Sequence, residues 1–352
     1  MGCSQSKATS TALYNSYVQD STKLNDLSGK VVAITGTSPG SIGYYIAEAA
    51  VKKNASVVLL LNRVSPRSAA AETSLKKVAG TSTTIETIPI DLLRLGSVTE
   101  ASEKVNAIAS KKGGLDVLAC NAGIMAMDDD RTEDGFNLEV QADHLSHAKL
   151  TKECMKSLKQ ASESRGEARV VFQSSGARYG SALLESKYFQ KCEPGTLGGN
   201  GAAGPWARYH QAKLANSCFA MGLYDLLRET SSYSKIKPIG CEPGYATSNL
   251  QNTSKNTGFV MQFILNLSHW LGGSHSPADG SLSASVACFG PNVDGGDFFL
   301  PGGRFNLAGA PVKSISMGKP LVKGKESETV NESNKRTVMD ATLEAFGWTS
   351  YV

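Results

Sequence analysis

Short apolar runs alternate with amphipathic stretches along most of this chain. The amphipathic stretches have the apolar spacing of helices and cover residues 42–53, 68–78, 97–110, 136–158 and 209–227. The apolar runs have the length of buried strands and cover residues 30–34, 57–61, 84–90, 116–120, 168–173 and 236–241. Because crossovers between parallel strands are right-handed, this alternation builds a parallel sheet with helices on both faces. The sequence therefore predicts an α/β fold with a doubly wound parallel sheet.

The chain is predicted to form a single domain with an extension at each end. Neither an internal repeat nor a Pro/Ser-rich linker divides residues 29–305, which we assign to the main domain. Residues 1–28 are polar and rich in Ser and Thr, as expected of a flexible tail. Residues 306–352 are the C-terminal extension, in which residues 306–326 look irregular and residues 332–346 have helical spacing.

Two stretches that follow predicted strands interrupt this alternation. Residues 178–206 are rich in glycine and fit either a mobile surface loop or a clamp over a ligand. Residues 247–276 include an apolar segment, residues 258–271, which fits either a buried helix or a lid with an apolar underside. Ligands of open α/β sheets bind beyond the carboxyl ends of the strands. Both insertions are therefore placed to cover a binding site.

Composition excludes several classes of protein. Lys+Arg 36 against Asp+Glu 32 leaves a formal charge of +4 that is spread along the chain, so nucleic acid is not an expected partner. The cysteines, Cys 7 in total, are widely spaced and mostly lie in apolar stretches, which indicates buried thiols in a reducing compartment. They form no CxxC or Cys/His cluster that would hold a metal ion. The apolar segment over residues 258–271 is too short to cross a bilayer.

The N-terminal sequence MGCSQSK fits an acylation signal. Removal of the initiator methionine frees Gly2 for myristoylation, and Ser6 occupies the position that this motif requires. One myristoyl chain binds a membrane only marginally, and the few charges of residues 1–30 supply no basic patch. Cys3 is placed to carry a second acyl chain, such as palmitate. We therefore predict a lipid-anchored protein, acylated at Gly2 and Cys3, on the cytoplasmic face of a membrane.

A glycine-rich turn joins the first predicted strand to the first predicted helix. Glycines there let the backbone approach a pyrophosphate, whose charge is stabilised by the amides and dipole of the helix N-terminus. The turn reads Thr35-Gly36-Thr37-Ser38-Pro39-Gly40-Ser41-Ile42-Gly43. Its expected contacts with a dinucleotide come from Gly36, Ser38, Gly40, Ile42 and Gly43.

The residue that follows the second predicted strand selects the dinucleotide. NAD-binding proteins usually carry an acidic residue there, which holds the ribose 2′-hydroxyl. This chain has Arg63 instead. A planar guanidinium matches the oxygens of a 2′-phosphate. The sequence therefore favours NADP(H) over NAD(H) as the cofactor.

Four motifs, in order, resemble those of the short-chain dehydrogenase/reductase family, and the resemblance covers nearly all of residues 30–305. The glycine turn is similar to the family's TGxxxGxG, and the others are Asn121-Ala122-Gly123 (NAG), Tyr209-His210-Gln211-Ala212-Lys213 (YxxxK) and Pro243-Gly244-Tyr245-Ala246-Thr247 (PGxxT). Phrases such as His144-Leu145-Ser146-His147 look most like the branch of retinol dehydrogenases and light-dependent protochlorophyllide reductases. The resemblance implies a Rossmann fold with an NADP-binding catalytic domain and oxidoreductase activity.

The resemblance also implies cofactor contacts at the matched positions. Asp91 is expected to border the adenine, and Asn121 to steady the fourth strand beside the cofactor. Lys213 is expected to hold the nicotinamide ribose, and Thr247 to contact the carboxamide. The remaining cofactor-binding positions of the matched motifs are Ala122, Gly123, Tyr209, Pro243 and Gly244.

The chemistry of these side chains is consistent with carbonyl reduction. Such a reduction needs a proton donor, and a phenol with a pKa of about 10 participates slowly near neutrality. Tyr209 and Lys213 are four residues apart on a predicted helix and share one face, so we expect the ammonium to lower the pKa of the phenol. Ser175, at the end of the fifth predicted strand, is expected to hydrogen-bond the substrate oxygen.

The chain departs from the family pattern at three places. The glycine turn has one extra residue, so Gly43 falls one position late. Asp143 stands where the family carries a helix asparagine for its proton relay; its carboxylate either orders a water near Lys213 or pairs with that lysine and weakens its effect on Tyr209. The segment between Ser175 and Tyr209 is longer than usual, which keeps Ser174 as an alternative to Ser175.

These observations predict an NADPH-dependent oxidoreductase that reduces a carbonyl, or oxidises the alcohol, of a lipophilic small molecule reaching a lid from a bilayer surface. One alternative is reduction of a carbon–carbon double bond, as in protochlorophyllide reductase, although that branch usually lacks the serine of position 175. The other is a catalytically weak, cofactor-binding scaffold, for which Asp143 is the best argument. The sequence leaves open the substrate, the reaction direction and the oligomeric state, a homodimer included.

Overall fold

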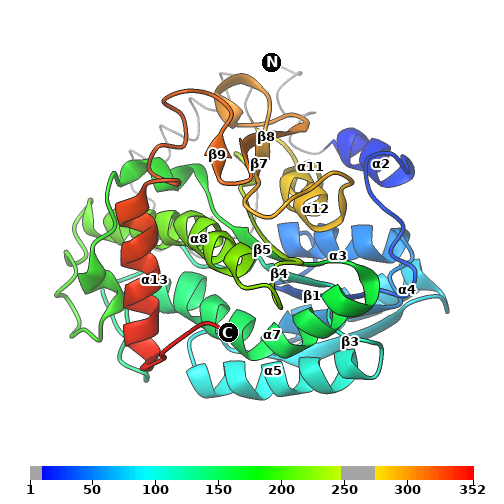
Figure 1. Cartoon of the computed structure of the whole chain (residues 1–352), viewed down its shortest axis with the longest axis horizontal. Helices are drawn as coiled ribbons and strands as arrows, with labels where there is room; N and C mark the ends of the chain where they lie inside the picture. The colour runs from blue at the N-terminus through cyan, green and yellow to red at the C-terminus, as the bar shows by residue number, and fades with distance from the viewer. Residues whose placement is uncertain (1–9, 247–273) are drawn as a thin grey trace.

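The middle of the central sheet is built from strands that are buried on both faces. β1 (Val31–Thr35) and β2 (Val57–Asn62) are buried at every position. The computed structural model describes residues 10–246 and 274–352, whose strands form a nine-stranded sheet in the order β3-β2-β1-β4-β5-β6-β7-β8-β9 (Figure 1). The other strands are β3 (Thr84–Pro89), β4 (Val117–Cys120), β5 (Ala168–Gln173), β6 (Ile236–Cys241), β7 (Phe298–Pro301), β8 (Pro311–Ser316) and β9 (Lys319–Pro320). β1 to β7 run parallel, which confirms the predicted doubly wound sheet.

Helices cover both faces of this sheet, and alternate side chains of each strand point to one layer or the other. Val31 and Ala33 of β1 face the first apolar core, and Val32 and Ile34 face the second. The first layer contains α5 (Leu95–Ser110), α7 (Ser146–Arg165), α8 (Gly204–Glu229) and α13 (Glu332–Phe346). The second layer contains α2 (Ala12–Gln19), α3 (Ile42–Lys52), α4 (Pro66–Ala79), α11 (Pro277–Gly280) and α12 (Leu282–Phe289). No helix of the described residues has the length and apolar content needed to span a membrane.

The prediction of a flexible tail over residues 1–28 is wrong for the part that the structure describes. Helix α2 packs on the second layer, and Tyr14 is buried. The backbone N–H of Tyr14 donates to Asp279 Oδ1 (2.8 Å), and its hydroxyl donates to the carbonyl of Tyr45 (2.9 Å). The apolar positions Tyr14 and Val18 lie one helical turn apart, which is the signal that a polar composition obscured.

The C-terminal extension is also more regular than its sequence indicates. β8 and β9 form antiparallel edge strands that join the sheet next to β7, a strand that the periodicity did not reveal. The interpretation of residues 306–326 as irregular is therefore wrong, and position 305 is not a structural boundary. These strands are short, and Pro311 and Pro320 lie at their ends, so their pattern resembles that of a loop. Helix α13 begins and ends where the spacing predicted.

The helix predicted over residues 136–158 is interrupted where it passes the sheet. It begins as α6 (Leu138–Val140), continues as a π-helical turn, η1 (Gln141–Leu145), and becomes α7. Such π turns are frequent at functional sites. This one carries Asp143, which is fully buried.

The glycine-rich insertion packs against α8. It contains two short 3₁₀ turns, η2 (Gly176–Gly180) and η3 (Ser186–Phe189), and Phe189 is fully buried in the first apolar core. A Cβ at Gly180 would lie 2.2 Å from the ring of His210 on α8. The described insertion is therefore packed against the first layer, which argues against a mobile surface loop over residues 178–206 and leaves the clamp over a ligand untested.

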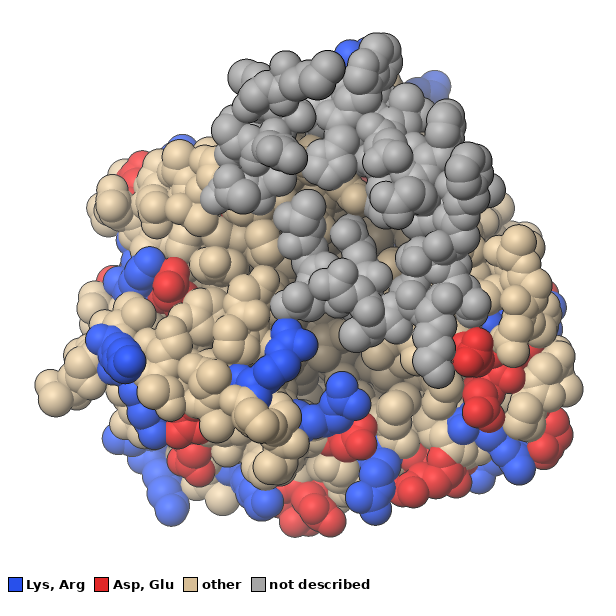
Figure 2. All heavy atoms as spheres, turned by 180° about the vertical axis from the view of Figure 1, so that it is seen from behind, with Lys and Arg blue, Asp and Glu red and all other residues tan. Residues whose placement is uncertain are grey.

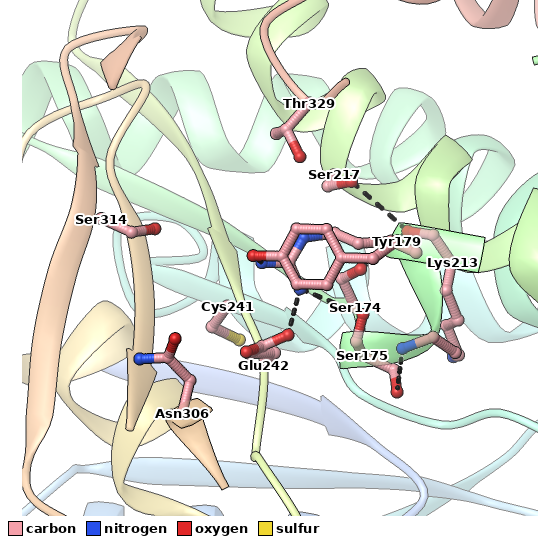
Figure 3. A network of polar contacts seen from close by, with 12 residues as sticks. Ser174, Ser175, Tyr179, Lys213, Ser217, Cys241, Glu242, Asn306, Ser314 and Thr329 are labelled. Atoms are coloured by element: carbon pink, nitrogen blue, oxygen red, sulfur yellow. Dashed lines mark hydrogen bonds and ion pairs between the residues drawn. The ribbon is translucent and has the colours of Figure 1, made fainter. Parts of the chain in front are cut away.

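A buried ionic network ties the insertion to the rest of the fold (Figure 3). Arg178 of η2 pairs with Glu242, which directly follows β6, and with Glu326 of the C-terminal extension, whose Oε1 lies 2.7 Å from Nη2. Arg178 Nη1 also donates to the carbonyl oxygen of Ser175 (3.0 Å), and the Tyr179 hydroxyl donates to Glu326 (2.8 Å). Because a buried charge persists only when it is paired, this network fixes three separate segments beside Ser175.

The network predicts a stability defect. Glu326→Gln leaves Arg178 buried with one carboxylate, and we expect the free energy of unfolding to fall by about 3 kcal/mol. Urea unfolding followed by circular dichroism measures this change. The matched control is Glu328→Gln, because the Glu328 carboxylate forms no ion pair within the described part of the chain. Equal stability of Glu326→Gln and the unmutated protein would contradict the role assigned to this network.

Candidate active site

The turn between β1 and α3 has the geometry of a phosphate cradle. Gly36 and Gly40 have φ values of 74° and 72°, in the left-handed region that favours glycine. A Cβ at Gly43 would lie 2.4 Å from the carbonyl oxygen of Gly36, so only glycine lets α3 begin this close to β1. The extra residue of the turn lies between Gly40 and Gly43. Ser41, in the same stretch, caps α3, because its side chain accepts a hydrogen bond from the Tyr44 amide.

The first amides of α3 are oriented for an anion. The amides of Ile42 and Gly43 open the helix and have no partner inside it. The Ser38 carbonyl accepts from the Ser41 amide (3.0 Å) and closes the turn in front of them. A pyrophosphate fits this arrangement because it accepts hydrogen bonds from open amides and is stabilised by the positive end of the helix dipole.

The ends of β2 and β3 border this turn. Asn62, the last residue of β2, holds the turn from the side, since its Oδ1 accepts from the Thr37 amide (2.8 Å). Arg63 follows and is exposed, and it forms no ion pair with another described residue. Asp91, after β3, is half-buried, and its Oδ1 accepts from the Leu93 amide (3.0 Å). The guanidinium of Arg63 is therefore available to an anionic group placed beside the turn.

The end of β4 is joined to the end of β1. Asn121 Nδ2 donates to the carbonyl of Thr35 (2.9 Å), and Thr35 Oγ1 accepts from the amides of Asn121 and Ala122 (both 2.9 Å). His147 Nε2 lies 3.0 Å from the same hydroxyl. Burial lowers the pKa of His147 to about 4, so it is neutral at pH 7. His147 is thus a buried support for this junction, a role that its motif alone did not reveal.

The junction between the ends of β1 and β4 faces α8. Three polar side chains meet there: Tyr209, Lys213 and Asp143. Tyr209 is 4% exposed, and Lys213 Nζ lies 5.5 Å from the centroid of its ring. Lys213 Nζ is also 2.7 Å from Asp143 Oδ2, and Asp143 Oδ1 accepts from the Ile124 amide (2.7 Å). A Cβ at Gly123 would lie 3.0 Å from both Asp143 Oδ2 and Lys213 Nζ, so glycine leaves the pair room to form. The carboxylate therefore pairs directly with the lysine.

This ion pair changes the expected electrostatics of the tyrosine. Burial raises the pKa of Tyr209 above its ordinary value, and the Asp143 carboxylate adds to the increase, whereas the Lys213 ammonium and a hydrogen bond with Ser175 oppose it. Burial lowers the pKa of Lys213, but Asp143, with smaller contributions from Tyr209 and Glu139, raises this pKa overall. Lys213 thus lowers the pKa of Tyr209 as expected, but burial and Asp143 outweigh it, so the expected overall fall of this pKa is wrong in this structure. Tyr209 is a neutral phenol over the physiological range.

The two candidate serines have different partners. Ser174 is buried, and its hydroxyl donates to the carbonyl of Lys213 (2.7 Å), so it anchors α8. Ser175 is half-buried, accepts from the Ala177 amide (3.2 Å) and hydrogen-bonds Tyr209. The structure thus places Ser175, rather than Ser174, beside the phenol.

Sequence reasoning missed a buried pair near Asp143, formed by Glu139 and Arg208. Glu139 lies on α6, and its Oε2 is 3.7 Å from Arg208 Nε, with both side chains fully buried. Burial, together with the Asp143 carboxylate, raises the pKa of Glu139 to about 8. At pH 7 Glu139 is therefore mostly protonated, and Asp143 is the carboxylate that acts on Lys213. No local motif marks Glu139, because its burial depends on how α6 packs against α8.

The turn after β6 closes the other side of the site. Gly244 has a φ of 66°, and a Cβ there would lie 2.5 Å from the carbonyl oxygen of Leu307. The carbonyl of Pro243 lies 2.6 Å from His275 Nε2. Thr247, the apolar segment 258–271, and the acylation positions Gly2 and Cys3 lie outside the described residues.

Comparisons with known proteins agree with this geometry. The chain matches the family described as short chain dehydrogenase over residues 30–188. It is 31% identical over 277 residues to an uncharacterised oxidoreductase of Schizosaccharomyces pombe, covering 76% of this chain and 74% of that protein. It is 27% identical over 329 residues to the short-chain dehydrogenase/reductase drtF of Aspergillus calidoustus, covering 90% and 98% of the two chains. Over 284 residues it is 27% identical to polyprenol dehydrogenase of Danio rerio, covering 80% and 81%.

Solved structures share the fold. A protein of uncharacterised function from Mycobacterium paratuberculosis has a TM-score of 0.64 and 22% identity, covering 92% of this chain and 96% of that one. The NADPH-dependent 3-quinuclidinone reductase of Rhodotorula rubra has a TM-score of 0.54 and 18% identity, covering 77% and 88%. At these identities the likeness concerns the fold alone. The family match and the sequence relatives carry the assignment: the chain is an oxidoreductase that belongs to the short-chain dehydrogenase/reductase family.

Proposed function

We propose that this protein uses NADPH to reduce a carbonyl group of a lipophilic small molecule, and oxidises the corresponding alcohol in the reverse direction. The observation that carries the proposal is the convergence of Tyr209, Lys213 and Ser175. Lys213 lies against Gly123, and the two residues before Gly123 pack on the glycine turn. A hydroxyl pair next to a buried ammonium suits a substrate oxygen that gains negative charge during the reaction.

The residues of the chain supply the proton and stabilise charge. A bound nicotinamide dinucleotide supplies the hydride that forms the new C–H bond. The hydroxyls of Ser175 and Tyr209 donate hydrogen bonds to the carbonyl oxygen, and Tyr209 transfers its proton to that oxygen as negative charge develops there. Lys213 then stabilises the phenolate that is left, while Asp143 holds the ammonium in place. The product is an alcohol, and Tyr209 recovers its proton from solvent.

The electrostatics of the site support the reductive direction. A phenol donates a proton only while it is protonated, and burial and Asp143 raise the pKa of Tyr209. Alcohol oxidation needs the phenolate as the base, and the same effects disfavour that form. We therefore propose that reduction is the faster direction at neutral pH.

Two features support NADPH as the electron donor. The glycine turn fits a pyrophosphate, and Arg63 is exposed next to it, where a 2′-phosphate would lie. A guanidinium gives a doubly charged phosphate a stronger interaction than it gives a ribose hydroxyl.

Apolar side chains near Tyr209 support a lipophilic substrate. Trp206 contacts the ring of Tyr209 edge to face, with the ring centroids 6.1 Å apart. In the insertion that follows Ser175, Tyr179 and Leu183 are large apolar side chains that are 51% and 58% exposed. The relative from Danio rerio is named for a polyprenol, a lipid alcohol. The predicted acylation of Gly2 and Cys3 would bring the protein to the membrane in which such substrates dissolve.

A second candidate function is that of a cofactor-binding protein with weak turnover. The ion pair between Asp143 and Lys213 favours it, because the carboxylate reduces the help that the ammonium gives to a phenolate. A neutral phenol that donates its proton depends less on the ammonium than a phenolate that must take a proton from an alcohol. The experiments below separate the two candidates.

Replacing the proton donor tests the proposed chemistry. Tyr209→Phe should lower kcat for carbonyl reduction by about 10²- to 10⁴-fold, because the site loses its general acid. The affinity for NADPH, measured by its fluorescence on binding, should change little. Tyr224→Phe, further along the same helix, is the matched control and should keep full activity. Retention of turnover in Tyr209→Phe would refute the mechanism, and absence of turnover in the unmutated protein across lipophilic aldehydes and ketones would favour the second candidate.

The role of Asp143 is visible in the pH dependence. Asp143→Asn removes a charge that raises the pKa of Tyr209, so this pKa should fall. The loss of reductase activity at alkaline pH should then begin at a lower pH than in the unmutated enzyme, and alcohol oxidation should gain activity near neutrality. Glu139→Gln is the comparison, because the charge of Glu139 raises the pKa of Tyr209 less than the charge of Asp143 does, so its replacement should shift the profile less. A pH profile of kcat/KM that Asp143→Asn leaves unchanged would contradict the proposed electrostatics.

Cofactor preference is tested at Arg63. Arg63→Ala should raise KM for NADPH by about 10- to 100-fold, which corresponds to the loss of charge-assisted hydrogen bonds, and should leave KM for NADH nearly unchanged. Lys77→Ala removes an exposed cation from the last turn of α4 and serves as the control. An equal effect of Arg63→Ala on both dinucleotides would show that Arg63 does not read the 2′-phosphate.

A further inference from the structure

Residues 302–325 form a surface with an unusual composition, which we call the 302–325 surface. It comprises the loop after β7, strands β8 and β9, and the segment after β9 (Figure 1). Backbone hydrogen bonds hold these parts side by side, since the Gly302 amide donates to Ala310 (2.8 Å) and the Leu321 amide donates to Ser314 (2.9 Å). The surface is therefore one folded unit rather than a set of separate loops.

Large apolar side chains are exposed on this unit. Their exposed fractions are 65% for Phe305, 43% for Val312, 54% for Met317, 57% for Leu321 and 52% for Val322. Single exposed apolar residues are ordinary, but a set of five within one small unit is typical of an interaction site. Half of the exposed large hydrophobic residues of the described chain lie here.

The charges of this unit have one sign. Residues 302–325 contain five basic residues and no Asp or Glu. Lys313 pairs with Asp297 (2.7 Å), whereas four others are exposed and form no ion pair with a described residue: Arg304, Lys319, Lys323 and Lys325. The face in Figure 2 differs, because there acidic and basic side chains lie interspersed along its lower part. Exposed cations among apolar side chains complement a layer of anionic headgroups above hydrocarbon.

The 302–325 surface borders the candidate active site. The Tyr245 amide donates to the carbonyl of Leu307 (2.7 Å), so the loop after β7 lies against the turn that contains Gly244. β8 and β9 also lie at the same end of the molecule as α2, the first described helix (Figure 1). A membrane that contacted this surface would therefore lie near both the site and the chain segment that leads to the predicted acylation positions.

We propose that the 302–325 surface docks the protein on a membrane that contains anionic lipids, with the apolar side chains entering the headgroup layer and the four cations contacting lipid phosphates and carboxylates. This goes beyond the proposed reaction and does not require it. It also supplies the basic patch that residues 1–30 lack, from a part of the chain remote in sequence. One acyl chain combined with such a patch gives stable membrane binding where one chain alone does not.

Vesicle binding of the full-length, unacylated protein tests the proposal. The Gly2→Ala background removes the myristoylation site, and cosedimentation compares phosphatidylcholine vesicles with mixed phosphatidylcholine–phosphatidylserine vesicles. We expect binding to the mixed vesicles that weakens as salt is raised. Lys319→Ser/Lys323→Ser/Lys325→Ser should weaken this binding at least tenfold, since each lysine near an anionic surface contributes about fivefold. Leu321→Ser/Val322→Ser should weaken it as well.

The matched control is Lys104→Ser/Lys111→Ser/Lys112→Ser, which removes three exposed lysines on and just after α5, at the opposite end of the molecule (Figure 1). It should bind mixed vesicles as the parent does. Equal binding by the 319/323/325 variant and this control would overturn the proposal. So would a change from dimer to monomer in the Leu321→Ser/Val322→Ser variant with vesicle binding intact, because the surface would then be a contact between two copies.

The same variants separate this proposal from the proposed reaction. Reduction of a small water-soluble ketone by the 319/323/325 variant should match that of the parent, because none of these lysines belongs to the site. Vesicle binding in a protein that reduces no carbonyl would count against the proposed function and would still support the docking surface.

Discussion

The buried ion pair between Lys213 and Asp143 governs the chemistry that this site can perform. Its two charged atoms are 2.7 Å apart, and the lysine lies beneath the ring of Tyr209. The family pattern has an asparagine at the position of Asp143, and an uncharged amide there would leave the ammonium free to stabilise a phenolate. Here burial raises the pKa of Tyr209 most, and the Asp143 carboxylate adds to the increase, so the tyrosine stays protonated. The pair thus favours an enzyme that donates protons over one that removes them.

The geometry of that pair depends on segments that are distant in sequence. The π-helical turn η1 directs Asp143 toward α8, and the hydrogen bond from Ser174 to the Lys213 carbonyl fixes α8 against β5. Arg178 joins Ser175 to the end of β6 and to Glu326 in the C-terminal extension. The extension is therefore part of the support for the site, although it follows the motifs that define the family. The same extension presents the 302–325 surface, which links the site to the proposed membrane contact.

Sequence reasoning found the parts of this structure that repeat or that lie in a short motif. Local periodicity or a short motif sets the strands β1 to β6, the glycine turn and the Tyr209–Lys213 spacing, and the structure has them in place. It did not find α2, β7, β8 and β9. β7 is buried throughout but only four residues long, and α2, β8 and β9 have mixed burial, so none of them shows a clear period. It also missed the buried acid Glu139 and the sign of the pKa shift at Tyr209. Both depend on which charges lie close together after folding, and spacing along the chain does not encode that distance.

The central claim is that Tyr209 is a neutral phenol held beside a charged lysine that is paired with Asp143. The most direct measurement is an ultraviolet difference titration of the phenolate, comparing the protein with Tyr209→Phe so that the signal of this one ring is isolated. The account predicts that Tyr209 ionises above the ordinary tyrosine pKa of about 10, and that Asp143→Asn brings the transition to lower pH. Formation of the Tyr209 phenolate near neutral pH in the unmutated protein would contradict it.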